Sequence, residues 1–136
     1  MVRTDHGIAA VKIAEALTEA FLLKSVDRLK DFYSDDIAIC HHYDGVVQNK
    51  AQNLAYLVCV MQTYESLYYT NIRRVLTAEG IVQQHVLVGK MADGRTMEMP
   101  ACIVFEVKEG VVTRIDEYLN PAPAVALRSP AVPTNR

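Results

Sequence analysis

The sequence lacks several features that would indicate a membrane, a phosphate ligand or a disulfide framework. It has no tryptophan and no apolar run long enough to span a bilayer, so a membrane is not an expected partner. Its six glycines form neither a GxGxxG loop nor a GxxxxGK loop followed by Ser or Thr, so no dinucleotide cofactor is indicated. The three cysteines, Cys40, Cys59 and Cys102, are far apart and form no CxxC pair. They are more typical of buried small hydrophobic residues than of disulfides or thiolate zinc ligands.

The sequence also lacks an excess of charge of one sign. It has 14 basic and 16 acidic residues, and its formal net charge is -2. The only basic pair is Arg73-Arg74, and no helix-turn-helix or RNA-binding signature occurs, so nucleic acid is not an expected partner. Lys12 and Glu15 interrupt the apolar residues of the N-terminal segment, so the segment does not have the pattern of a secretory signal. A cytosolic chain is therefore expected. The length suits one domain, and the hydrophobic share of 51% predicts a substantial core.

Three consecutive β-strands are predicted between residues 81 and 120. Segments 81–91, 96–108 and 111–119 alternate in polarity, and turns containing Gly94 and Gly110 separate them. In the middle segment one face is predicted to be buried. That face carries Met97, Met99, Ala101, Ile103, Phe105 and Val107.

The same alternation places polar side chains on inward faces. In the third segment Glu117 shares a face with Val111, Ile115 and Leu119. In the first segment we assign the inward face to Gln83, His85 and Leu87. Two strands would then send ionisable groups into the same apolar interior.

The rest of the chain predicts helices at about 7–23 and 25–33, a helix of roughly 15 residues after Asn49, and strands at 37–43 and 67–76. Candidate N-caps are Asp5 or Thr4, Ser25 and Asn49. The strand at 37–43 is assigned an inward face with His41 and Tyr43.

This order of elements predicts an α+β domain with its helices on one face of a bent sheet. The domain is expected to span residues 1–122, followed by a poorly ordered, Pro/Ala-rich tail at 123–136.

Three short pieces, together with this order, resemble the SnoaL-like branch of the nuclear-transport-factor-2-like superfamily over about residues 5–122. They are Phe32-Tyr33-Ser34-Asp35-Asp36-Ile37, Glu109-Gly110-Val111-Val112 and Asp116-Glu117-Tyr118-Leu119. The resemblance implies a cone-shaped barrel, in which a strongly bent, mainly antiparallel sheet wraps around N-terminal helices and encloses a deep apolar cavity, often in a dimer. The superfamily includes isomerases, dehydratases, epoxide hydrolases, polyketide cyclases, lyases and pure binding proteins, so the fold does not name the reaction.

Neither of two well-known catalytic sets of the superfamily is complete in this chain. By the resemblance, the Asp-Arg-Asp set of limonene epoxide hydrolases falls on His85, Gln83 and Glu117, so only the last carboxylate is kept. The general base of ketosteroid isomerases falls near His41, and neither of their two hydrogen-bond donors is kept. The resemblance thus supports inward positions for the two histidines and the carboxylate without naming a substrate.

His41, His85 and Glu117 are the predicted catalytic residues, because two imidazoles and a carboxylate in an apolar cavity form an acid/base set. Predicted substrate-binding residues are Gln83, Tyr43, Leu87, Met99, Ala101, Ile115, Leu119, Leu57, Met61 and Tyr64, with Tyr68 as a further hydrogen-bonding candidate. Two protonation patterns are open. Glu117 could be desolvated with a raised pKa, or ionised beside His85 so that His85 acts as the base.

Two other interpretations of these residues are open as well. Glu117 could pair with Arg73 or Arg74 while the histidines satisfy backbone groups. The two histidines and the carboxylate also match a metal face in composition, but no HxH or HExxH spacing supports one.

The favoured hypothesis is a cofactor-independent acid/base enzyme of the isomerase, cyclase or lyase type, including retro-aldol elimination. Its substrate would be a small hydrophobic cyclic or aromatic compound. The alternative is a non-catalytic ligand-binding or dimerisation module, and an epoxide hydrolase or a metal enzyme is less favoured. The convex sheet face, with Cys102, Val104 and the valines of segment 81–91, is apolar enough to predict a homodimer.

Overall fold

The computed structural model describes residues 5–128 of the chain. The helices in this range are α1 (Asp5–Leu23), α2 (Asp27–Lys30), α3 (Lys50–Thr63) and α4 (Ala122–Arg128). The strands are β1 (Tyr33–His41), β2 (Val46–Gln48), β3 (Ser66–Leu76), β4 (Gly80–Lys90), β5 (Thr96–Lys108) and β6 (Val111–Leu119). No helix in this part of the chain has the length and apolar character needed to cross a bilayer.

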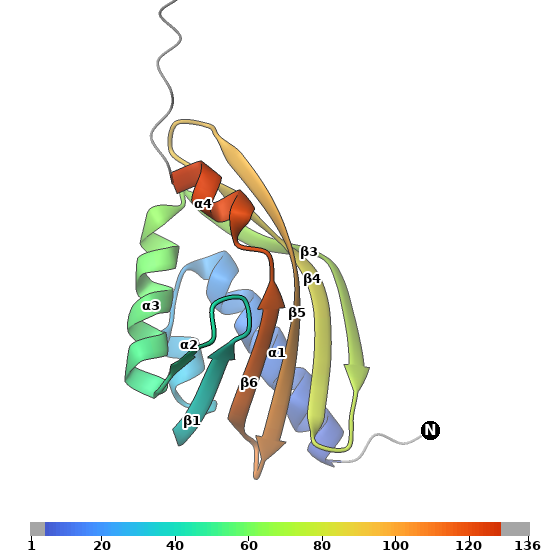
Figure 1. The fold of residues 1–136 in the computed structure, drawn as a ribbon. Coiled ribbons are helices and arrows are strands. Elements are labelled where there is room, and N and C mark those ends of the chain that lie inside the picture. The colour runs from blue at the N-terminus through green and yellow to red at the C-terminus, as the bar shows by residue number, and fades with distance from the viewer. Residues whose placement is uncertain (1–4, 129–136) are drawn as a thin grey trace, which may run out of the picture.

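The strands form one sheet in the order β2-β1-β6-β5-β4-β3. Strand β1 is parallel to β6, and the other neighbours are antiparallel. Figure 1 shows a bent sheet with α1, α3 and α4 gathered on one side of it. Helix α1 packs mainly on β3 and β4, α3 on β1, and α4 on β5. The predicted α+β class and the antiparallel arrangement of β4, β5 and β6 are confirmed.

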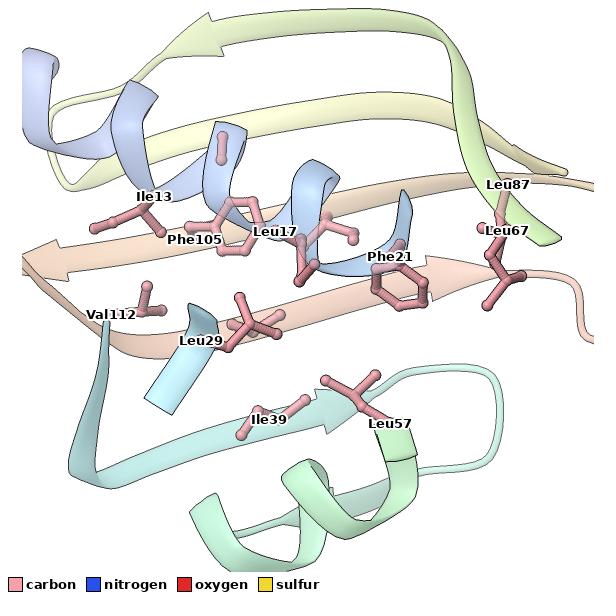
Figure 2. Close-up of a cluster of buried hydrophobic side chains, with 14 of the residues drawn as sticks. Ile13, Leu17, Phe21, Leu29, Ile39, Leu57, Leu67, Leu87, Phe105 and Val112 are labelled. Carbon is pink, nitrogen blue, oxygen red and sulfur yellow. The ribbon is translucent and has the colours of Figure 1, made fainter. Parts of the chain in front are cut away.

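The hydrophobic core fills the space between α1 and the inner face of the sheet (Figure 2). Leu17 and Phe21 of α1 are buried there with Phe105 of β5, which is 1% exposed. Leu57 of α3 and Ile39 of β1 extend the same cluster. The predicted inward face of β5 is therefore the face that the core covers.

Helix α3 begins where the sequence predicts, at the Asn49 cap. The Asn49 side chain accepts a hydrogen bond from the backbone N–H of Gln52 at 2.9 Å, and the Gln52 side chain accepts one from the backbone N–H of Asn49 at 2.9 Å. This reciprocal capping box satisfies two amides that the first helical turn leaves unpaired. It fixes where the helix starts and thus which side chains face the sheet.

The start of β6 departs from simple alternation. A register shift between Glu106 and Val107 leaves Thr113 as an extra residue in β6, so side chains before it change face. Val112 is fully buried and Val111 is half-buried, so the predicted inward position of Val111 is wrong. Beyond the bulge, Ile115 and Glu117 face inward as predicted.

Two further expectations differ from the structure. Helix α2 follows Val26 without a side-chain cap, so the predicted Ser25 cap is wrong. Residues 122–128 form α4 where a poorly ordered tail is expected, because Ala124 and Leu127 are buried against the rest of the molecule. Asp5 is the first residue of α1, and the alternative cap Thr4 lies outside the described residues. The domain boundary at residue 122 stays a prediction, and residues 129–136 lie outside the described range.

Candidate active site

A pocket of about 170 Å³ opens between helices α3 and α4 and the inner face of β4, β5 and β6. Apolar side chains of α3, β4 and β5 form most of its wall. The lining side chains that carry a polar group are those of Tyr43, Tyr56, Tyr64, Tyr69, His85 and Glu117, with Thr63 and Cys59 on α3. A small apolar hollow with a few polar groups is typical of a binding site for a small organic molecule.

Most of the predicted site residues line this pocket. They are Tyr43, Leu57, Tyr64, His85, Leu87, Met99, Ala101, Glu117 and Leu119. Strand parity brings them together, because the inward positions of β4, β5 and β6 all face α3 and α4. Their catalytic or binding roles stay predictions.

Four predicted residues do not line the pocket. Met61 and Ile115 are buried in the hydrophobic core. Gln83 is fully buried and is hydrogen-bonded to Arg74 and to His85. His41 is 4% exposed and lies beyond Glu117 and Tyr43, in contact with both. The last two can therefore act on a ligand only through the residues that they contact.

Several pocket residues were not predicted. They are Phe21, Tyr56, Cys59, Val60, Thr63, Tyr69, Met97, Pro121 and Ala124. The alternation of β3 could have indicated Tyr69, because it shares a face with the buried Leu67 two residues earlier. The candidate Tyr68 is exposed on the other face. Pro121 and Ala124 belong to the segment that was expected to be a tail. Cys59 is exposed and Cys102 is half-buried, so the prediction that the three cysteines are buried is correct only for Cys40.

Glu117 and His41 form the central pair of the site. His41 and Glu117 are register partners on the parallel strands β1 and β6. The His41 Nδ1 atom lies 3.4 Å from Oε1 of Glu117 and 2.9 Å from the hydroxyl oxygen of Tyr43. Glu117 is 23% exposed and lines the pocket, so the carboxylate is placed between the imidazole and the pocket.

A chain of amides fixes the orientation of His41. Tyr33 donates to Oδ1 of Asn53 at 3.0 Å, and the amide nitrogen of Asn53 donates to Oε1 of Gln48 at 2.9 Å. The same Gln48 oxygen lies 3.0 Å from Nε2 of His41. Because an amide oxygen only accepts, Nε2 carries a proton. Nδ1 is therefore the nitrogen that gains or loses a proton beside Glu117.

The hydrogen bond to Glu117 raises the pKa of His41, while burial opposes this by lowering it. The pairing with Glu117 therefore favours the protonated form of the His41 imidazole. Tyr43 also hydrogen-bonds Tyr56, and burial, together with Tyr56 and Glu117, raises the pKa of Tyr43. Tyr43 thus stays a neutral hydroxyl that can donate to a deprotonated Nδ1.

His85 lies on β4 and Glu117 on β6, the two strands that flank β5. The pKa of His85 is lowered, whereas that of His41 is raised. The His85 ring stacks on Tyr69 with centroids 3.8 Å apart. Burial, with a smaller contribution from the Arg74 charge, lowers its pKa from 6.5 to about 4. His85 is therefore a neutral imidazole at pH 7.

These contacts exclude one of the two open protonation patterns, in which Glu117 lies beside His85. Residue 83 of β4 and Glu117 of β6 both pair with Ile103 of the intervening β5, and His85 pairs with Ala101, so the backbones of the two outer strands stand roughly 10 Å apart. The carboxylate pairs with His41 instead of His85, and Arg74 bonds Gln83 instead of the carboxylate. Among the described residues, no three His, Cys, Asp or Glu side chains are grouped as a metal site would require. His42, the residue after His41, is bound to Asp116 at 2.7 Å and is exposed.

Comparisons with known proteins place the fold but not the reaction. No protein family model and no curated protein matches the sequence. A candidate SnoaL-like polyketide cyclase from Jannaschia sp. CCS1 superimposes with a TM-score of 0.79 at 14% identity, over 98% of this chain and 99% of that one. A candidate polyketide cyclase from Xanthomonas campestris pv. campestris gives 0.77 at 22% identity, over 92% of this chain and 100% of that one.

A third solved structure is a protein with a ketosteroid isomerase-like fold from Catenulispora acidiphila, in complex with trimethylamine. It gives a TM-score of 0.73 at 14% identity, over 85% of this chain and 90% of that one. The chain therefore has the cone-shaped fold of nuclear-transport-factor-2-like proteins, and the predicted resemblance is confirmed at the level of the fold.

Proposed function

We propose that the protein is a cofactor-independent acid/base enzyme that removes and returns a proton on a small hydrophobic cyclic or aromatic compound. One observation carries this proposal: the carboxylate of Glu117 lines an apolar pocket and is backed at 3.4 Å by a buried imidazole. A carboxylate that faces a ligand can take a proton from it, and an imidazole beside the carboxylate can share that proton when its ring is neutral. The candidate cyclases and the ketosteroid isomerase-like protein among its structural neighbours are consistent with such chemistry.

Glu117 is the proposed base. It would remove a proton from a carbon next to a carbonyl group, and the new carboxylic O–H would face Nδ1 of His41. A neutral His41 can accept that proton at Nδ1, because its Nε2 proton is already held by Gln48. Tyr43, at 2.9 Å from Nδ1, donates to the ring when the ring is neutral. His41 is thus a positioning and proton-sharing residue behind the base.

His85 is the proposed partner for the charge that develops on the ligand. A neutral imidazole with one N–H can donate a hydrogen bond to an enolate oxygen without giving up its proton. Its separation from Glu117 across β5 lets the carbonyl oxygen and the acidic C–H of one ligand face different walls. Isomerisation, cyclisation and elimination, including retro-aldol cleavage, can all proceed through such an enolate.

A ligand-binding protein without turnover is the second candidate. The exposed apolar side chains on the outer face of the sheet, such as Tyr118 and Val75, fit a module that serves mainly for association. The homodimer through that face and the cytosolic location stay predictions.

Recovery of the natural ligand would separate the two candidates. Protein purified from its own host would be extracted, and its bound compound identified by mass spectrometry. The compound would then be incubated with fresh protein in D₂O. Incorporation of deuterium at carbon, or conversion to a new species, supports the enzyme. Stoichiometric binding with neither change supports the binding protein.

A further inference from the structure

We infer that Arg74 and Gln83 are positioning residues that hold His85 in the tautomer with its proton on Nε2, so that the pocket offers its ligand a hydrogen-bond donor at this point. Both residues lie outside the pocket. They act through contacts that run from α1, across β3, to the histidine on β4. The tautomer itself does not depend on the proposed function, whereas the identity of the ligand atom that His85 meets rests on it.

The first step is the orientation of the Gln83 amide. The Arg74 Nε atom donates to Gln83 Oε1 at 2.9 Å, and a guanidinium has no acceptor, so the oxygen of the amide must face Arg74. Arg74 is held in turn by a second bond from its NH2 group to the Thr18 hydroxyl at 3.1 Å. Thr18 donates its own proton to the backbone oxygen of Ala14 at 3.0 Å, which leaves its oxygen free to accept from Arg74.

The second step is the histidine ring. With its oxygen on Arg74, Gln83 presents its NH₂ group to Nδ1 of His85 at 2.9 Å. An NH₂ group donates, so Nδ1 must accept, and a neutral ring then carries its proton on Nε2. The bond from Gln83 occupies Nδ1 and leaves the Nε2–H for another partner. His85 lines the pocket, so this N–H is the group available to a ligand.

Burial makes the arrangement costly to break. Gln83 is fully buried and His85 is 5% exposed, so a reversed amide would set two donors against each other without water to relieve them. The stack of His85 on Tyr69, with planes 15° apart, also restricts rotation of the ring. The positive charge of Arg74 disfavours a second proton on the ring. Arg74 thus sets the tautomer through Gln83 and adds to the effect of burial, which is the main cause of the neutral charge.

The pocket should therefore prefer ligands that place a hydrogen-bond acceptor next to the His85 N–H. A ligand with a carbonyl or enolate oxygen, or an aromatic nitrogen, can bond to the His85 N–H. A ligand that presents an amine or ammonium group at the same place meets a donor and loses that bond.

The test is nuclear magnetic resonance of ¹⁵N-histidine-labelled protein, in which long-range ¹H–¹⁵N correlations distinguish a protonated from an unprotonated ring nitrogen. His85 would be assigned by the spectrum of His85→Gln. The expected wild-type result at pH 7 is a neutral ring with Nε2 protonated. In Gln83→Glu the new carboxylate can only accept a hydrogen bond from Nδ1, so protonation of Nδ1 is expected.

Arg74→Met should raise the pKa of His85 toward 6.5 and reduce the share of the Nε2–H tautomer. Arg73→Met is the matched control, because it removes the same charge from the adjacent, exposed position of β3 and should leave both properties unchanged. A wild-type ring protonated on Nδ1, or equal effects of the two arginine variants, would overturn the inference. If Gln83→Glu does not fold, the wild-type spectrum and the arginine pair still decide. No substrate is needed, so failure of the proposed function would not produce either result.

Discussion

His41 Nδ1 and Glu117 Oε1 lie 3.4 Å apart on two parallel strands, and this pairing gives the two histidines of the site opposite electrostatic states. The imidazole of His41 gains a carboxylate partner, which raises its pKa. His85 has no carboxylate partner, and burial, with a smaller contribution from the nearby Arg74, lowers its pKa to about 4. One pocket thus combines a proton-accepting pair with a neutral donor.

Replacing Glu117 by Gln should lower the pKa of His41, because the main cause of its raised value is removed while burial remains. A histidine titration by nuclear magnetic resonance measures this directly. The pair should also stabilise the fold most below pH 6.5, and this contribution should be lost as the pH rises through the folded-state pKa. Urea unfolding at several pH values should therefore show a larger deficit for Glu117→Gln at low pH. Glu98→Gln, an exposed change on β5, is the control.

His85 should make the folded state sensitive to acid in a different range. Its folded pKa of about 4 lies below the ordinary 6.5, so the unfolded chain binds a proton more readily between these values. Stability is lost as the pH falls from 6.5 to 4, by roughly 3 kcal/mol for a shift of this size. His85→Gln should lose less stability over that range when unfolding is followed by urea titration. Parallel pH curves for the two proteins would show that His85 is not buried as a neutral ring.

Gly89 is predicted to keep room for Tyr64 in the pocket wall. A Cβ atom on Gly89 would lie 2.8 Å from the Tyr64 ring and 3.0 Å from the terminal carbon of Met97. Gly89→Ala should push these two side chains into the pocket and weaken ligand binding, measured by calorimetry with the compound recovered from the protein. Lys90→Ala, at the exposed neighbouring position, should bind normally. Unchanged affinity in Gly89→Ala would place the ligand elsewhere.

Asn49→Ala should destabilise the protein by about 1 kcal/mol, since the first turn of α3 loses its capping box. Helix α3 carries one wall of the pocket, so its first turn bears on the site as well as on the fold. Chemical denaturation measures the change. Gln62→Ala, at the exposed far end of the same helix, should cost much less.

Alternation of polarity was sufficient to place most of the inner face of the sheet. It predicts the inward positions of Gln83 and His85 on β4 and of Glu117 on β6, because hairpin-connected strands keep their parity from one turn to the next. It fails at Val111, since the bulge at Thr113 depends on the register with β5 and leaves no local mark in the sequence. It also misses α4, whose Ala124 and Leu127 are stabilised by burial against distant residues.

Parity tells which side of a sheet a residue faces, but not which residue it meets. The partners that the sequence leaves open for Glu117 include His85, on a strand joined to β6 through two hairpins, and Arg73 or Arg74. The observed partner, His41, comes from β1, which pairs with β6 in parallel after more than sixty intervening residues. Nothing in the local sequence specifies that pairing. The resemblance to a known fold supports an inward His41 but does not set its contact with the carboxylate.

Solvent deuterium exchange measures whether Glu117 acts as the base next to the pocket. The compound recovered from the protein would be incubated in D₂O with wild-type protein, Glu117→Gln and Glu98→Gln, and its affinity for each measured in parallel. We expect Glu117→Gln to bind the compound but to exchange or convert it at least about a hundredfold more slowly, the lower end of the range for a general base. Glu98→Gln should match the wild type. Equal rates in Glu117→Gln and wild type would contradict the assignment of Glu117 as the base.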